Sequence, residues 1–247
     1  MTAEDIRALR KLWQEAFGDP DAFVNAFFTL GFSPGRCHCI WEDGQPVSVL
    51  YWFDCGLETH KLAYIYGAAT RKSHRGQGLG SRLFRETHEI LRAQDYRGVI
   101  LVPGEESLFA FYRKLGYRAG STVSEFSSAA GDAPLPLHQI DASEYARLRG
   151  KYLPEGGVTQ SAHTLTFLHS ICKLYAGEDF LLAGECIGGH FFAQELLGNT
   201  NAAPAILRTL GCAKGRFRAP GKDRTLSMFL PLTENCPVPT YFAPALD

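Results

Sequence analysis

The residues best suited to chemistry in this sequence lie in a glycine-rich segment around positions 70–81. The run Arg75-Gly76-Gln77-Gly78-Leu79-Gly80-Ser81 follows an apolar, strand-like stretch at 61–69 and leads into a helical pattern at 81–93. A helix that starts directly after a loop presents free backbone N–H groups and the positive end of its dipole there. Glycines let the backbone approach a phosphate closely. The segment therefore predicts a phosphate-binding site, and the simpler alternative is a solvent-exposed turn with a basic surface.

Three phosphate-binding patterns compete for this loop. A Walker A loop requires Gly-Lys-Ser/Thr, which is absent. A dinucleotide fingerprint starting at Gly76 requires glycine at position 81, where Ser81 stands. It also requires an acidic residue about 20 positions later, where the next strand ends in Leu101-Val102-Pro103 instead. The third pattern, R/Q-x-x-G-x-G/A, is matched at every position of 75–80, so a nicotinamide enzyme is the least favoured alternative.

A second segment accompanies this loop at the expected distance. Residues 107–117 read Ser-Leu-Phe-Ala-Phe-Tyr-Arg-Lys-Leu-Gly-Tyr, close to A-x-x-F-Y-x-K-x-G-F/Y, with Leu108 where alanine is common. With both segments, the first half of the chain resembles the GCN5-related N-acetyltransferase (GNAT) superfamily. The resemblance implies an α/β (α+β) GNAT fold with a mixed, mostly antiparallel central sheet, and acetyl coenzyme A as cosubstrate.

The resemblance also implies which residues contact the coenzyme. In the family, the strand before the loop pairs with the pantetheine arm, the loop amides hold the pyrophosphate, and a backbone N–H near the end of that strand stabilises the oxyanion. Glu105 stands where the family often has an asparagine that contacts the coenzyme. The expected contacts are Gly67, Ala68, Ala69, Thr70, Arg75, Gly76, Gln77, Gly78, Leu79, Gly80, Ser81 and Glu105.

Tyr112 is the expected general acid. When an amine attacks the thioester, the sulfur leaves as a thiolate, whose conjugate acid has a pKa of about 8.5. A tyrosine, with an ordinary pKa of about 10, can donate a proton or a hydrogen bond to it. The alternative is a core aromatic that packs beside Phe109 and Phe111.

The sequence identifies no unique base and no metal site. Five carboxylates stand at expected strand ends or turns and are more simply surface groups: Asp54, Glu58, Glu105, Glu106 and Glu125. Cys37, His38 and Cys39 alternate sides in the strand expected at 37–43, so they do not converge on a metal. We therefore expect no metal cofactor.

The second half of the chain predicts a second unit without this chemistry. Small residues and prolines favour a division into a GNAT domain at 1–127, a linker at 128–136 and a degenerate GNAT-like domain at 137–247. Shifting the chain by 95 residues places 110–116 over 205–211 with four matches in seven, and puts Leu207 in the place of Tyr112.

This organisation resembles the tandem acetyltransferases of the enhanced-intracellular-survival type, without room for their third, sterol-carrier-like domain. In those relatives the C-terminal carboxylate can act as the base. The resemblance implies, as a hypothesis, that Asp247 does so here, at the end of an apolar tail. The alternative is a tail that only covers a sheet edge.

Composition limits the other possibilities. The 25 Lys and Arg balance 26 Asp and Glu, which argues against a nucleic-acid partner. No apolar run reaches the roughly 18 residues that span a bilayer, and the charged N-terminus is unlike a signal peptide, so we expect a cytoplasmic protein with no membrane partner. Seven cysteines without a C-x-x-C pair favour reduced thiols.

The expected activity is acetyl-CoA-dependent transfer of an acetyl group to a primary amine of a small molecule or peptide. The alternative is a non-catalytic acyl-CoA-binding regulatory protein. The identity of the acceptor and the oligomeric state stay open.

Overall fold

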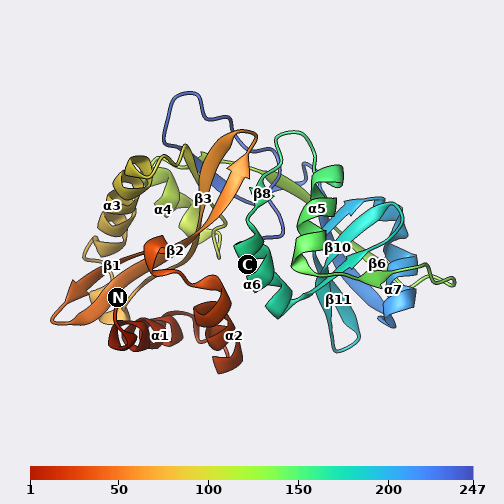
Figure 1. The fold of residues 1–247 in the computed structure, drawn as a ribbon, viewed down its shortest axis with the longest axis horizontal. Helices are drawn as coiled ribbons and strands as arrows, with labels where there is room; N and C mark the ends of the chain where they lie inside the picture. The colour runs from red at the N-terminus through yellow and green to blue at the C-terminus, as the bar shows by residue number, and fades with distance from the viewer. Residues whose placement is uncertain (247) are drawn as a thin grey trace.

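The computed structural model describes residues 1–246 as two seven-stranded mixed sheets with helices packed on both faces of each. The two sheets lie side by side along the longest axis of the molecule, and helix α6 lies between them (Figure 1). This mixed α/β architecture agrees with the predicted fold class.

The first sheet has the order β1-β2-β3-β4-β14-β5, with β8 added on β2. Only β3 and β4 are parallel within that order. The strands are β1 Cys37–Glu42, β2 Gln45–Leu57, β3 His60–Thr70, β4 Gly98–Leu101, β5 Arg118–Ala119, β8 Thr159–Gln160 and β14 Met228–Pro231. Helices α1 (Ala3–Phe17), α2 (Asp21–Ala26) and α6 (Ala162–Ile171) cover one face, while α3 (Leu79–Ala93) and α4 (Ser107–Lys114) cover the other.

The second sheet has the order β13-β6-β12-β11-β10-β9-β7. Helix α7 (Ala203–Leu210) covers one face, and α5 (Ala142–Tyr152) packs on the other. The strands are β6 Thr122–Ala129, β7 His138–Gln139, β9 Lys173–Ala176, β10 Phe180–Ile187, β11 His190–Gly198, β12 Lys214–Pro220 and β13 Arg224–Thr225.

The two sheets exchange strands reciprocally. Strand β6, from the end of the first half, pairs with β12 in the second sheet, with Phe126 opposite Phe217. Strand β14, from the end of the second half, pairs with β4 in the first sheet, with Phe229 opposite Ile100. The first sheet thus contains a strand from the second half, and the second sheet contains a strand from the first half. The division into 1–127, 128–136 and 137–247 therefore stays a proposal.

The topology corrects the sequence alignment of the two halves. Helix α7 connects the parallel pair β11 and β12, as α3 connects the parallel pair β3 and β4. The counterpart of α7 is therefore α3 and not α4, and Leu207 does not stand in the place of Tyr112. Helices α4 and α7 are both eight residues long, and a Leu-Gly pair stands at the end of each, so a match of sequence patterns could not distinguish them.

Two further expectations need correction. The apolar pattern of residues 161–175 predicts one continuous helix, but α6 ends at Ile171, and Lys173–Ala176 form β9 because they pair with β10. Cys186 of β10 and Cys212, just after α7, form a disulfide, so the expectation of reduced thiols is wrong for this pair. Folding brings together two cysteines that the sequence places 26 residues apart.

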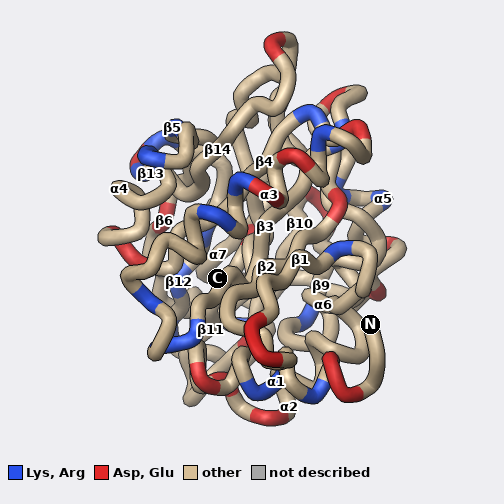
Figure 2. The backbone as a smooth tube through the Cα atoms, turned by 90° about the vertical axis from the view of Figure 1, so that its left-hand side faces the viewer, with Lys and Arg blue, Asp and Glu red and all other residues tan. Residues whose placement is uncertain are grey.

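Of the helices described within residues 1–246, none is long and apolar enough to cross a membrane. Lys and Arg are interspersed with Asp and Glu along the chain in the side view (Figure 2), in keeping with the balanced composition.

Candidate active site

A cavity of about 560 Å³ lies where the two halves of the chain meet. Residues of β3, Tyr112 of α4 and residues of α1 line it from the first half. Leu168 of α6 and Glu185 of β10 line it from the second half, together with Ala245 and Leu246 near the C-terminus. The cavity thus joins three features that the sequence identified separately: the strand before the loop, the tyrosine and the tail.

The end of β3 presents an unpaired backbone edge to this cavity. Strand β4 pairs with β3 only from Leu62 to Ile65, and beyond that point β3 pairs with β2 alone. Tyr66, Gly67 and Ala68 line the cavity. The N–H and C=O groups of Gly67 and Ala68 on the β4 side offer hydrogen bonds to an extended, amide-bearing chain, as an exposed strand edge does.

Gly67 forms an irregularity in β3 that only glycine accommodates. Its φ is +60°, and the pairing of β2 with β3 shifts register at this point. A Cβ on Gly67 would lie 2.7 Å from Cζ3 of Trp13. The position therefore combines a left-handed backbone with close contact to a cavity-lining ring.

We expect Gly67→Ala to lower the free energy of unfolding by at least the roughly 1–3 kcal/mol that a left-handed non-glycine residue costs. It should also weaken acetyl-CoA binding, because Trp13 and the strand edge must shift. Gly18→Ala is the matched control, since Gly18 has a φ of +69° but nothing within 4 Å of its Cβ position. Chemical denaturation and titration with acetyl-CoA measure both effects, and equal results for the two variants would contradict this role of Gly67.

The glycine-rich loop takes the form expected of an anion site. Gly76 and Gly78 have φ values of +78° and +80°, and Gly78 directly precedes α3. The first intrahelical bond runs from Arg82 N–H to Gly78 C=O, which leaves the N–H groups of 79–81 free for a ligand. Arg75 Nε donates to Thr70 C=O at 3.1 Å and so ties the loop to the end of β3.

Tyr112 is the buried residue of α4, and it lines the cavity. Its ring lies 5.5 Å from that of Phe84 and 5.2 Å from that of Phe111. Within residues 1–246 its hydroxyl has no hydrogen-bond partner, and burial raises its pKa to about 12. The ring of Tyr112 therefore packs in the core, as the alternative interpretation expects. The residue also borders the cavity, as a general acid must.

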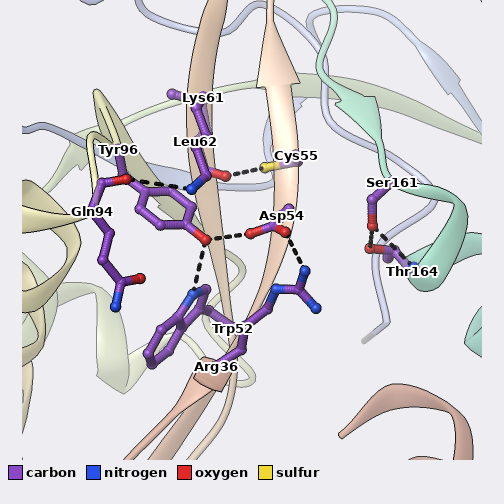
Figure 3. Close-up of polar contacts among 10 residues, drawn as sticks. All are labelled: Arg36, Trp52, Asp54, Cys55, Lys61, Leu62, Gln94, Tyr96, Ser161 and Thr164. Atoms are coloured by element: carbon purple, nitrogen blue, oxygen red, sulfur yellow. Dashed lines mark hydrogen bonds and ion pairs between the residues drawn. The ribbon is translucent and has the colours of Figure 1, made fainter. Parts of the chain in front are cut away.

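Several predicted residues lie elsewhere. Glu105 is exposed and does not line the cavity. Asp54 pairs with Arg36 at 2.5 Å and accepts a hydrogen bond from Tyr96 (Figure 3). Glu125 lies among three arginines in the second sheet. None of these three carboxylates lines the cavity that contains Tyr112.

The structure adds two carboxylates that the sequence did not place at the site. Asp19, in the turn after α1, accepts a hydrogen bond from Trp13 Nε1 at 2.8 Å and lines the cavity. Glu185 lines it from β10. Glu185 lies far from the motif in sequence, so no local pattern could have identified it.

The tail enters the cavity along a fixed path. Tyr241 C=O accepts from Val158 N–H at 2.9 Å, and Ala243 C=O accepts from Arg149. Leu246 N–H donates to the Tyr64 hydroxyl at 3.2 Å. Asp247, the hypothetical base, lies outside the described residues.

Arg149 is itself held by a buried ion pair. Its side chain is 3% exposed and that of Glu195 is 0% exposed, with Nε 2.9 Å from Oε2. Tyr145 donates to the same carboxylate at 2.7 Å. Both halves therefore hold the tail: Val158 and Arg149 bind it from the second half, and Tyr64 binds it from the first. Among residues 1–246, no group of three or more His, Cys, Asp or Glu side chains could hold a metal ion.

Comparisons with known proteins bear on this arrangement. Residues 1–120 match the acetyltransferase (GNAT) domain family. This match agrees with the family that the motifs predicted for that part of the chain. No curated protein sequence matches the chain significantly.

Solved structures extend the likeness over both halves. A GCN5-related N-acetyltransferase from Kribbella flavida is 18% identical with a TM-score of 0.70, over 93% of this chain and 69% of that one. Eis1 from Mycobacterium abscessus is 12% identical with a TM-score of 0.66, over 94% and 72%. A putative acetyltransferase from Pyrococcus horikoshii is 16% identical with a TM-score of 0.63, over 98% and 91%. The prediction of a GNAT fold followed by a second GNAT-like unit is confirmed.

Proposed function

We propose that this protein transfers the acetyl group of acetyl-CoA to a primary amine of a small molecule or peptide. One observation carries the proposal: the unpaired edge of β3, Tyr112 and the C-terminal tail border the same cavity. The glycine-rich loop at 75–81 supports it, since its free N–H groups suit the pyrophosphate of the coenzyme.

In this mechanism the residues of the chain position and polarise the thioester. The edge of β3 pairs with the pantetheine arm, and a backbone N–H near Gly67 stabilises the oxyanion as the amine nitrogen attacks the carbonyl carbon. The carbon–sulfur bond then breaks, and Tyr112 donates to the departing sulfur. Its raised pKa keeps it protonated at neutral pH, so the donor is present when the thiolate forms.

The acceptor ammonium must lose a proton to a base before its nitrogen can attack, and we assign the role of this base to Asp247. The support is the path of the tail, since the residues just before it line the cavity that contains Tyr112.

Deleting residues 245–247 should reduce turnover to background while acetyl-CoA binding is retained, because the loop and the edge of β3 remain. Deleting Asp247 alone is the sharper variant, since Ala245 and Leu246 then stay in place. Coenzyme A release and calorimetric titration measure the two properties. Unchanged turnover in both variants would rule out the tail as the base.

The test of the function is a coenzyme-A-release assay across alkylamines, polyamines, amino acids, aminoglycosides and lysine peptides. Acetylation of one class, with saturable acetyl-CoA binding, is the expected result. Acetyl-CoA binding without turnover of any amine would favour the regulatory alternative, although Tyr112 beside the edge of β3 argues for turnover.

A further inference from the structure

A second, smaller cavity of about 210 Å³ lies on the second sheet. Arg216 and Arg218 of β12 and Arg224 of β13 line it, and all three pair with Glu125 of β6. Oε1 of Glu125 lies 3.2 Å from Nε of Arg218 and 2.5 Å from Nη2 of Arg224. Arg216, Arg218 and Arg224 therefore share the single carboxylate of Glu125. Figure 2 shows Lys and Arg segments beside the labels of β12 and β13.

Arg216 and Arg224 have hydrogen-bond donors beyond the one that each gives to Glu125. A guanidinium has five N–H donors, whereas a carboxylate offers about four acceptor sites. The side chains of Arg216 and Arg224 are 64% and 44% exposed, so their remaining donors are accessible to a ligand. Burial raises the pKa of Glu125, but hydrogen bonds and charge from the arginines outweigh it and lower the pKa to about 2. The local charge therefore stays fixed across the physiological pH range.

One residue joins this cavity to the active-site cavity. Gln194 of β11 lines both, and its Oε1 accepts a hydrogen bond from Arg218 Nη1 at 3.3 Å. The charged residues that line the first cavity, among those described, are both acidic: Asp19 and Glu185. A molecule that spans the two cavities therefore meets the carboxylates of Asp19 and Glu185 in the first cavity and the guanidinium groups of Arg216 and Arg224 in the second.

Apolar side chains also line both cavities. Phe192, which lines the second cavity, is 43% exposed. Leu168 and Ile171 of α6 line the first. The combination fits a molecule whose two polar ends are separated by a hydrocarbon or aromatic segment.

We propose that the acceptor is dipolar: its primary amine enters the active-site cavity, and a carboxylate or phosphate several bonds away binds Arg216 and Arg224. The assignment rests on the proposed acetyltransferase function and names its substrate class. A diamine or polyamine is disfavoured because its second cation would face the arginines.

The experiment compares acceptors that differ in one end group. A length series of linear ω-amino carboxylates and ω-aminoalkyl phosphates is assayed for coenzyme A release beside the alkylamine and the α,ω-diamine of equal length. The anionic acceptors of fitting length should have kcat/KM higher by about tenfold or more, the scale of a charge-assisted hydrogen bond. Carboxylate and phosphate series run in parallel distinguish the two anions.

The double variant Arg216→Gln/Arg224→Gln should remove this preference by raising KM, with kcat at saturation unchanged. Arg147→Gln is the matched control, because Arg147 is 70% exposed on α5, pairs with Glu144 and lines neither cavity. Inorganic phosphate should inhibit competitively against the anionic acceptors and have little effect with the alkylamine.

Equal kcat/KM for the anionic and neutral acceptors overturns the inference, as does a preference that survives in the double variant. Equal inhibition of all acceptors by phosphate does so too. Calorimetry in the presence of coenzyme A measures the affinities for the same compounds, so it tests the preference for anionic acceptors even without turnover. The proposed acetyltransferase function would be contradicted by a different result: wild-type protein that releases no coenzyme A with any amine.

Discussion

Neither half of this chain is expected to fold alone. Cutting between Asp132 and Ala133, in an exposed loop after β6, should yield a fragment 1–132 that lacks β14 and a fragment 133–247 that lacks β6. Each fragment loses an internal strand of its sheet and exposes the edges on both sides of the gap. Phe229 illustrates the loss: it is fully buried and packs so closely on Gly98 that a Cβ there would lie 2.6 Å from the ring.

Circular dichroism and limited proteolysis of each fragment check this expectation, and co-expression of the two fragments is the control. Since the cut breaks no strand, the pair should assemble into a complex with one cooperative unfolding transition. A fragment 1–132 that unfolds cooperatively by itself would show that β14 is dispensable.

Tyr112→Phe should reduce kcat by on the order of 10²-fold to 10⁴-fold, the range of general acid catalysis, with unchanged acetyl-CoA affinity. The phenylalanine ring keeps the contacts with Phe84 and Phe111, so only the hydroxyl is lost. Because the pKa of Tyr112 is raised to about 12, the group is protonated below that pH, and the wild-type rate should show no loss from its ionisation up to about pH 11.

Tyr117→Phe is the matched control for this variant. Tyr117 is also buried, but its hydroxyl is bonded to His88 Nε2 at 2.9 Å and it does not line the cavity. Its loss should affect stability and leave kcat nearly unchanged. Coenzyme A release and calorimetry distinguish the two variants, and equal kcat values would refute the role of Tyr112 as the acid.

Predictions from sequence succeeded where the elements are adjacent in the chain. The order of β3, the glycine-rich loop, α3, β4 and α4 follows from local periodicity and glycine signals. They failed where strand pairing decided the outcome: β9, which pairs with β10, replaced the end of a predicted helix, and α7 proved to be the counterpart of α3. The disulfide joins Cys186 and Cys212, which lie 26 residues apart in the chain, so it depends on tertiary packing.

The sequence by itself indicated the resemblance of the first unit to the GNAT family, the position of the loop at 75–81 and Tyr112 as the candidate acid. These are local properties, because a loop between a strand and a helix carries its own hydrogen-bonding pattern. Only the tertiary structure decided that Asp19, Glu185 and the tail border one cavity with Tyr112. It also decided the strand exchange that joins the two units, since strand edges pair wherever folding brings matching edges together, irrespective of their distance along the chain.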